Sequence, residues 1–219
     1  MMKRNNFPFS AVLGLNHAKT AILIVLVNPR AGGLLISGPR GIGKSTLMRS
    51  TQELIERPWR DIPVSVTEDR LFGTIDTEKA IYSGQKKLYP GIINEADQGV
   101  LYLDDANLLR EDLLDSILNI AEVGAYQLER DGLSLRCDTS FTVIAAINPE
   151  SGMLSGACLD QFGLFVNVDN IHDENTRVEI LKRTISFEKD CASFCNLWKL
   201  ENEKIKKAIH SAMSLLPKV

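Results

Sequence analysis

A short run of residues combines glycine, lysine and serine at a spacing that suits phosphate binding. It reads Gly38-Pro39-Arg40-Gly41-Ile42-Gly43-Lys44-Ser45 and matches the pattern G-x-x-x-x-G-K-[ST]. The glycines let the backbone curl so that its N–H groups surround phosphate oxygens. Lys44 is placed to reach the β- and γ-phosphates of ATP, and Ser45 to ligate Mg²⁺. We expect nucleotide contacts from Gly38, Pro39, Arg40, Gly41, Ile42, Gly43, Lys44, Ser45 and Thr46.

The surroundings of this run distinguish it from a chance glycine turn. Leu34–Ser37 is a short apolar stretch typical of a buried strand, and Ser45–Ile55 carries apolar residues at helical spacing. A strand before the loop and a helix after it form the context that a phosphate-binding loop requires. Nucleotide binding is therefore the favoured interpretation.

Two carboxylates follow a second apolar stretch, Val100–Leu103. Such a stretch is typical of a central parallel strand that helices cover on both faces. In phosphate-loop enzymes a carboxylate at this position holds the water shell of Mg²⁺, and the next one polarises the attacking water. We assign the first role to Asp104, which with Ser45 forms the expected metal site, and the second to Asp105. The alternative explanation, that these two carboxylates cap the helix expected from Glu111, is weaker because that helix begins too far along the chain.

A third candidate, Asn148, ends the apolar stretch Phe141–Ile147. A polar side chain at such a strand tip can reach the γ-phosphate or the attacking water. Taken alone, Asn148-Pro149 is more typical of a turn. Its position after the phosphate loop and the acidic strand favours a catalytic role, shared with Lys44 and Asp105.

The order of predicted elements defines the fold class. Strands are expected at Leu34–Ser37, Ile62–Val66, Val100–Leu103, Phe141–Ala146 and Leu164–Val168, and helices at Ser45–Ile55, within Tyr89–Asp97, at Glu111–Val123 and from Asp173 onward. Ala18–Val27 reads as a mostly buried helix, with a buried strand as the alternative, and Asp131-Gly132 predicts a hairpin turn. This alternation predicts an α/β fold with a parallel sheet between helices and a nucleotide at the carboxyl ends of its central strands.

Composition narrows the class of protein further. A net charge of −3 gives no electrostatic reason to expect nucleic acid as a partner. The longest apolar run, Ala21–Val27, is too short to span a membrane, and the N-terminus lacks the apolar core of a secretory signal. The four cysteines lack a zinc-site spacing and are interpreted as reduced thiols. We therefore expect a cytoplasmic protein.

Several longer stretches occur in one colinear series. They read FPFSAVLG (Phe7–Gly14), VTEDRLFGTIDTEKAI (Val66–Ile81), PGIINEADQGVLYLDDANLL (Pro90–Leu109), LERDGLSLR (Leu128–Arg136) and INPESGML…LDQFG (Ile147–Gly163). Together they resemble the ATPase subunits of magnesium and cobalt chelatases. The resemblance covers nearly the whole chain, so it is far more specific than the phosphate loop alone.

This resemblance implies a P-loop NTPase of the AAA+ class, helix-insert type, that works in a homo- or hetero-oligomeric ring. Leu71–Gln85 looks like the family's insert before the acidic strand, and Leu128–Arg136 like its second hairpin. The family couples ATP hydrolysis to metal insertion into a tetrapyrrole. Its partners are a D-like subunit with an adhesion-type domain and a large porphyrin-binding subunit. By this resemblance, residues 1–172 form the ATP-binding core, and 173–219 form a helical extension toward a lid domain.

Three departures from the family pattern bear on activity. The chain has Asp104-Asp105 where the family has Asp-Glu, and an aspartate is one methylene shorter. It has Gln161 where the family has an arginine that reaches the neighbouring subunit's nucleotide. The family's helical lid would begin about where this sequence stops, so the chain is either a fragment or a short paralogue.

These departures leave alternative functions open. One is a degenerate subunit that holds ATP and shapes the ring while hydrolysis occurs elsewhere. Another is a MoxR-like AAA+ chaperone, which the chelatase-like stretches at both ends of the chain disfavour. With the neutral Gln161 in place of the arginine, we expect hydrolysis by the chain alone to be slow.

Overall fold

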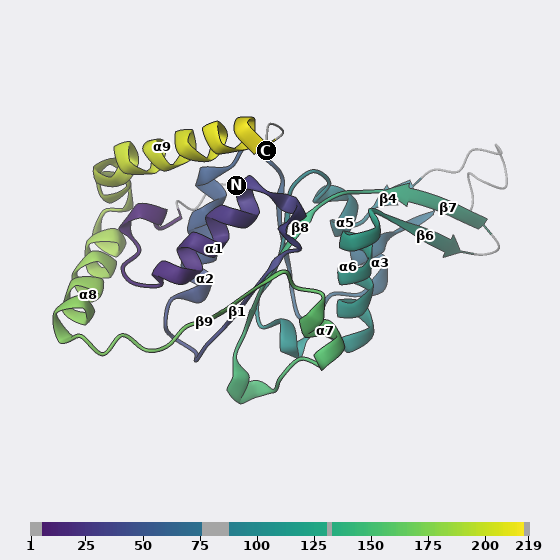
Figure 1. Ribbon diagram of the computed structural model, residues 1–219, viewed down its shortest axis with the longest axis horizontal. Helices are drawn as coiled ribbons and strands as arrows, with labels where there is room; N and C mark the ends of the chain where they lie inside the picture. Colours follow the sequence, from purple (N-terminus) through teal and green to yellow (C-terminus); the bar gives the residue numbers. More distant parts are fainter. Residues whose placement is uncertain (1–5, 76–87, 131–132, 217–219) are drawn as a thin grey trace.

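The computed structural model describes residues 6–75, 88–130 and 133–216. At its centre lies a parallel five-stranded sheet with the order β2-β5-β8-β1-β9. Helices cover both of its faces (Figure 1). Its strands are β1 (Leu34–Ser37), β2 (Trp59–Ile62), β5 (Val100–Leu103), β8 (Thr142–Ile147) and β9 (Leu164–Asn167). The predicted α/β class is confirmed, and the three strands expected at the centre, β5, β8 and β1, are neighbours.

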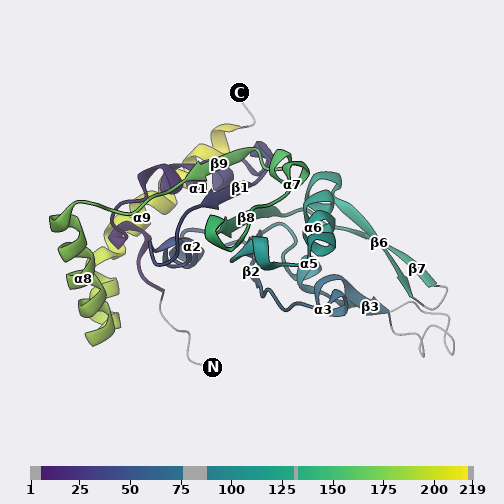
Figure 2. The same ribbon diagram turned by 90° about the horizontal axis from the view of Figure 1, so that it is seen from below.

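The buried sheet supplies two separate hydrophobic cores because successive side chains of a strand point to opposite faces. Leu34 and Ile36 of β1 pack toward α1 (Asn16–Val27), α2 (Lys44–Ser50) and α9 (Cys191–Leu215). Leu35 packs on the other face. There the covering helices are α3 (Glu68–Phe72), α5 (Ile92–Glu95), α6 (Glu111–Val123) and α7 (Gly156–Asp160). Figure 2 shows the helices on the two sides of the sheet from below the molecule.

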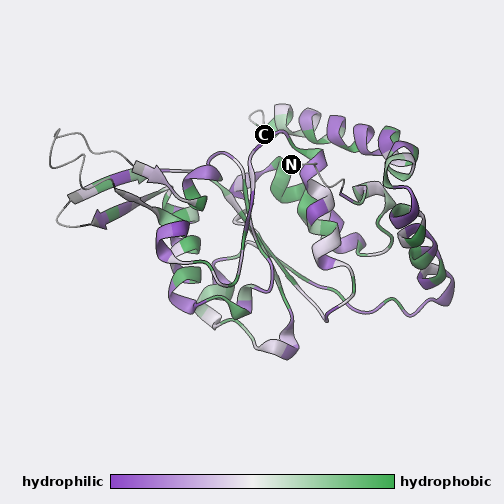
Figure 3. Ribbon diagram, turned by 180° about the vertical axis from the view of Figure 1, so that it is seen from behind, coloured by the Kyte–Doolittle hydropathy of each residue, from purple (hydrophilic) through white to green (hydrophobic). Residues whose placement is uncertain are grey.

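Burial on both faces explains why the central strands lack an alternating pattern. All residues of β1, β5 and β8 are buried. In Figure 3 the hydrophobic colour follows the strands and α1, whereas the outer side of α9 is mostly hydrophilic. Ala18–Val27 is helical, as favoured, and belongs to α1.

Among the described residues, no helix is both long enough and apolar enough to cross a membrane.

Two antiparallel hairpins project from the α3–α6 side. One pairs β6 (Ala125–Arg130) with β7 (Leu133–Asp138), which confirms the hairpin expected around positions 131 and 132. The other pairs β3 (Gly73–Ile75) with β4 (Leu88–Pro90). Part of the predicted Leu71–Gln85 insert, residues 76–85, lies outside the described residues.

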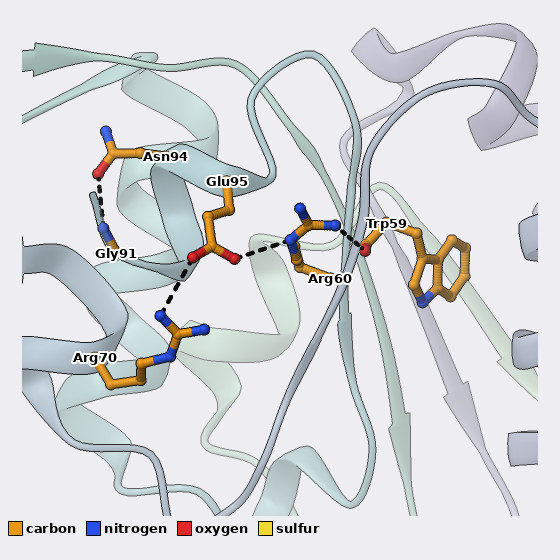
Figure 4. Close-up of polar contacts among 6 residues, drawn as sticks. All are labelled: Trp59, Arg60, Arg70, Gly91, Asn94 and Glu95. Carbon is orange, nitrogen blue, oxygen red and sulfur yellow. Dashed lines mark hydrogen bonds and ion pairs between the residues drawn. The ribbon is translucent and has the colours of Figure 1, made fainter. Parts of the chain in front are cut away.

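Ion pairs fasten the base of the β3–β4 hairpin region to the sheet edge. Figure 4 shows Glu95 of α5 between Arg60 of β2, at 3.0 Å, and Arg70 of α3, at 3.2 Å. Asn94 beside it accepts a hydrogen bond from the backbone N–H of Gly91. Because both arginines are exposed, each pair contributes less than about 1 kcal/mol and mainly orients the helices.

The strand predicted at Ile62–Val66 is wrong, because the strand is Trp59–Ile62. Pro63 instead opens a turn in which the N–H of Val66 donates to the Pro63 carbonyl. The polar residues Arg60 and Asp61 interrupt the apolar pattern by which a strand is predicted. They are tolerated because β2 is an edge strand that exposes both side chains. A polar edge strand cannot be recognised from apolar runs.

Smaller differences occur at element ends. The helix expected within Tyr89–Asp97 is only α5, and Pro90 belongs to β4. The helix expected at Ser45–Ile55 ends at Ser50 and continues as a 3-10 turn because Ser50 and Thr51 hydroxyls both donate to the Leu47 carbonyl. The 3-10 turns are η1 (Phe9–Ala11), η2 (Pro29–Ala31), η3 (Thr51–Leu54), η4 (Ala106–Leu108) and η5 (Pro149–Ser151).

The C-terminal part is helical, as expected, and packs against the core. Asp173 caps α8 (Glu174–Lys189) by accepting from the N–H of Thr176, and Asp190 caps α9 in the same way. Arg183 of α8 donates to the Ala11 carbonyl and lies over the Trp198 ring. Ile209 of α9 belongs to the buried core.

Candidate nucleotide-binding site

The phosphate loop connects β1 to α2 at the carboxyl edge of the sheet. Gly41 and Gly43 have φ angles of 81° and 91°, which side-chain-bearing residues adopt at a cost. At Gly38 a Cβ atom would lie 2.4 Å from the Val168 carbonyl oxygen, so only glycine lets this loop pass β9. These three positions explain locally why the loop curls as the motif predicts.

Lys44, the first residue of α2, is buried and folds back over its own loop. Its ammonium donates to the carbonyls of Gly38, at 2.7 Å, and Pro39, at 2.8 Å. Burial lowers the pKa of Lys44, and the charges of Asp105 and Asp104 oppose that shift. The ammonium therefore lies in the field of both carboxylates.

Ser45 and Asp104 meet although they are far apart in sequence. The Ser45 hydroxyl donates to a carboxylate oxygen of Asp104 at 3.0 Å. β8 is the one strand between β5 and β1, and the carboxyl ends of all three lie at one edge. A hydroxyl and a carboxylate in contact are oxygen ligands of the kind that Mg²⁺ takes alongside phosphate oxygens, so this pair fits the ion.

Tyr102 of β5 lies beneath this pair. Its ring is fully buried against Trp59, and its hydroxyl has no hydrogen-bond partner among the described residues. Burial and the nearby charge of Asp104 raise the pKa of Tyr102 far above its usual range. The hydroxyl therefore stays protonated next to Asp104.

Asp105 follows Asp104 in an unusual backbone conformation. Its φ and ψ angles are 51° and 48°, the left-handed region that aspartate and asparagine enter more readily than other side-chain-bearing residues. Its carbonyl accepts the first hydrogen bond of η4, from the N–H of Leu108. The carboxylate is half-buried and close enough to Lys44 to influence its pKa.

Asn148 follows β8, between the phosphate loop and the acidic strand end. It is 2% exposed. Its side-chain oxygen accepts from the N–H of Glu150, and its nitrogen donates to the Ser151 hydroxyl at 3.2 Å. Arg40 of the phosphate loop donates to the same hydroxyl at 3.4 Å. The structure thus brings all three predicted groups, the loop, the carboxylates and the asparagine, to one edge.

A cavity of about 820 Å³ adjoins the phosphate loop. Gly41, Ile42, Gly43 and Thr46 form one wall. The opposite wall comes from α8, the N-terminal segment and the residues before α8, namely Phe7, Ala11, Val12, Leu13, Asn170, Ile171, His172, Arg177, Ile180, Leu181, Arg183, Thr184, Phe187 and Glu188. Sequence patterns missed this second wall, because it is assembled from segments at opposite ends of the chain.

A larger cavity, of about 1140 Å³, lies between α3, α6 and β6 on the other face of the sheet. Its walls include the carboxylates of Glu68, Asp115, Glu122 and Glu129, as well as Gln161. These carboxylates would repel a nucleotide's phosphates. The smaller cavity beside the phosphate loop is therefore the better candidate for a nucleotide.

Gln161 lies at the end of α7, away from the phosphate loop of its own chain. Its amide donates to the Ala157 carbonyl at 3.4 Å. The flanking residues Cys158 and Phe162 are buried, and the Cys158 thiol donates to a carboxylate oxygen of Asp115 at 2.8 Å. The backbone at Gln161 is therefore firmly anchored, while its side chain is neutral and only half-buried.

Comparison with known proteins agrees with this geometry. The AAA domain (dynein-related subfamily) profile matches residues 33–161, which run from the approach to the phosphate loop to Gln161. The magnesium-chelatase 38 kDa subunit of Rhodobacter capsulatus is 35% identical over 97% of this chain and 70% of its own length. The chain belongs to the magnesium-chelatase ATPase-subunit family.

Further members of the chelatase family show how widely the similarity extends. The magnesium-chelatase subunit ChlI homolog of Methanocaldococcus jannaschii is 33% identical over 100% of this chain and 70% of its own length. Among solved structures, a chain in the complex between subunits BchI and BchD of magnesium chelatase is 35% identical, with a TM-score of 0.71. That match covers 98% of this chain and 77% of the other. The AAA fold and family membership thus rest on both sequence and structure.

Proposed function

We propose that this chain is an ATP-binding AAA+ motor subunit that couples ATP binding and hydrolysis to metal insertion into a tetrapyrrole. The observation that carries the proposal is the contact between Ser45 and Asp104, because two separate motifs converge there on one metal-binding geometry. Bound Mg²⁺ would neutralise charge on the β- and γ-phosphates. Membership of the chelatase family supports the tetrapyrrole as the final substrate.

Each site residue has a role in this proposal. The backbone N–H groups of 38 and 40–46 would bind phosphate oxygens, and Lys44 would turn from its loop carbonyls toward the β- and γ-phosphates. Ser45 and Asp104 would hold Mg²⁺. Asp105 accepts a proton from the attacking water, and Asn148 contacts the γ-phosphate or that water. The cavity of about 820 Å³ receives the nucleoside, since ligand pockets commonly span roughly 300–1,000 Å³.

The partners follow from the relatives. We infer an oligomeric AAA+ ring that works with a D-type chelatase subunit, as in the BchI–BchD complex, and with a large porphyrin-binding subunit. We infer that residues 1–172 contain the ATP-binding core and that 173–219 contain a helical extension, of which α8 and α9 are described. The four free thiols support the cytoplasm as the compartment.

A second candidate function is a subunit that binds ATP but hydrolyses it weakly. Gln161 favours it, because a neutral amide cannot stabilise transition-state charge on a neighbour's nucleotide as an arginine does. In this case the chain shapes the ring and hydrolysis occurs in other subunits.

Reconstitution tests the proposed function. The chain is mixed with the D-type and porphyrin-binding subunits of a magnesium chelatase, ATP, Mg²⁺ and a porphyrin, and metal insertion is followed by porphyrin fluorescence. We expect insertion with the wild-type chain and none with Lys44→Ala. The second candidate would be favoured if the wild-type chain binds ATP but metal insertion is no faster than in a mixture that lacks the chain.

A further inference from the structure

Asn107 links two parts of the site that the sequence motifs treat separately. It lies in η4, two residues after Asp105. Its side-chain nitrogen donates to the Asn148 carbonyl at 3.1 Å and to the Gly152 carbonyl at 2.9 Å. One amide group therefore holds both ends of the loop 148–152.

The chemistry of this contact requires an asparagine. Two carbonyl oxygens face the same end of the side chain, so that end must carry two N–H donors. The other end, the Asn107 side-chain oxygen, is buried without a hydrogen-bond partner among the described residues. Leaving a buried acceptor unpaired is costly, so the two donated bonds are retained at some expense. Aspartate has the same shape but would place carboxylate oxygens against the carbonyls.

The loop that Asn107 holds is the one that aims Asn148. The Asn148 carbonyl also accepts from the N–H of Ser151, and the Asn148 side chain is bonded within the same loop. Ser151 in turn contacts Arg40 of the phosphate loop. Freeing the Asn148 carbonyl would let its side chain move relative to a bound phosphate, where a shift of about 1 Å can cost a hundredfold in rate.

We propose that Asn107 is a positioning residue that fixes Asn148 for recognition of the γ-phosphate by clamping the loop 148–152 to the segment after Asp105. This inference rests on the proposed function, since it assumes that Asn148 faces a nucleotide. It adds a residue that touches neither phosphate nor metal and acts through Asn148 alone.

The clamp itself is tested without nucleotide, by hydrogen exchange. Asn107→Ala and Asn107→Asp should speed exchange at the Ser151 and Gly152 amides roughly tenfold, the effect of losing about one net hydrogen bond. Asn119→Asp, the same chemical change at an exposed position of α6, should leave these amides unchanged. Unaltered exchange in both Asn107 variants would overturn the clamp whether or not the chain binds ATP.

The sensing role is tested by equilibrium binding. Fluorescently labelled ADP and a labelled non-hydrolysable ATP analogue are titrated with Mg²⁺ present. We expect the wild-type chain to prefer the triphosphate. Asn107→Ala should keep the wild-type ADP affinity within about twofold and lose this preference, and Asn148→Ala should have the same effect. In the Asn148→Ala background, Asn107→Ala should change nothing further. Equal weakening for both nucleotides, or an added loss in the double variant, would overturn the inference. A wild-type chain that binds neither nucleotide would overturn the proposed function and the sensing role together.

Discussion

The phosphate-binding edge (Lys44, Ser45 and Asp104) and the α7 surface (Cys158, Gln161 and Phe162) differ in whether a positively charged side chain is present. At the phosphate-binding edge, polar groups from distant segments come together: Lys44 is buried near Asp104 and Asp105, and the Ser45 hydroxyl donates to Asp104. At the α7 surface the backbone around Gln161 is equally well anchored, by the buried Cys158 and Phe162, yet the side chain carries no charge. If the proposed function holds, the backbone at this position is in place but the charge that would act on a neighbouring subunit is missing. We therefore expect nucleotide binding and efficient hydrolysis to be separable in this chain.

Lys44→Ala should give the largest effect, because it removes the positive charge of the lysine that is expected to contact the phosphates of ATP. Lysine makes charge-assisted hydrogen bonds to two phosphates, so we expect ATP affinity to fall by about 10²–10⁴-fold. Titration of a labelled nucleotide measures the loss. Lys199→Ala, which alters an exposed lysine of α9, is the matched control and should bind normally. Unchanged affinity in a folded Lys44→Ala protein would remove the phosphate loop from the proposal.

Gln161→Arg should give the next largest effect by restoring the missing charge. Arginine fingers contribute roughly 10³–10⁵ in rate in well-studied cases, and we expect at least about a tenfold rise in turnover here. The rise should occur only in assembled protein, since we expect the group to act across a subunit interface. Phosphate release over a protein concentration series measures it.

Gln161→Lys provides the control for this second prediction. It adds a point charge without the planar fork of arginine and should produce a smaller rise. If neither variant changes turnover in a demonstrably assembled sample, the α7 surface does not limit hydrolysis.

Asp105→Glu should have a smaller effect with two opposing parts. The longer side chain brings the carboxylate nearer the water, so turnover should rise by about two- to fivefold, less than for Gln161→Arg. The left-handed backbone at Asp105 suits aspartate better than glutamate, so the free energy of unfolding should fall by about 0.5–1 kcal/mol. Urea denaturation and phosphate release measure the two parts. A gain in turnover larger than that of Gln161→Arg would reverse the comparison between the two regions.

Tyr102→Phe should have the smallest effect on the ligand-free protein. Its hydroxyl has no partner among the described residues, so removing it should change the free energy of unfolding by less than about 0.5 kcal/mol. Tyr126→Phe is the matched comparison, because the Tyr126 hydroxyl lies 2.7 Å from both the Phe72 carbonyl and the Asn94 side-chain oxygen. That variant should lose about 1 kcal/mol. Equal losses in urea denaturation would mean that the Tyr102 hydroxyl is bonded in solution.

Much of the architecture was predictable because it depends on local sequence. β1, β5 and α6 have the predicted bounds, since each is a continuous apolar or amphipathic segment that ends at a glycine or a charged residue. The phosphate loop was equally clear, because its glycines set the backbone within a few residues. Prediction failed at β2, whose polar side chains Arg60 and Asp61 are tolerated only because the strand lies at the sheet edge.

The sequence by itself therefore determined the chemical groups, and the tertiary structure decided which of them meet. Nothing local in the motifs requires that Ser45 touch Asp104; the contact exists because β8 pairs with both β1 and β5. The cavity beside the phosphate loop and the two hydrogen bonds of Asn107 likewise join segments that lie far apart in the chain. Such contacts depend on strand order and helix packing, which are set by non-local burial of apolar surface and leave no fixed spacing in the sequence.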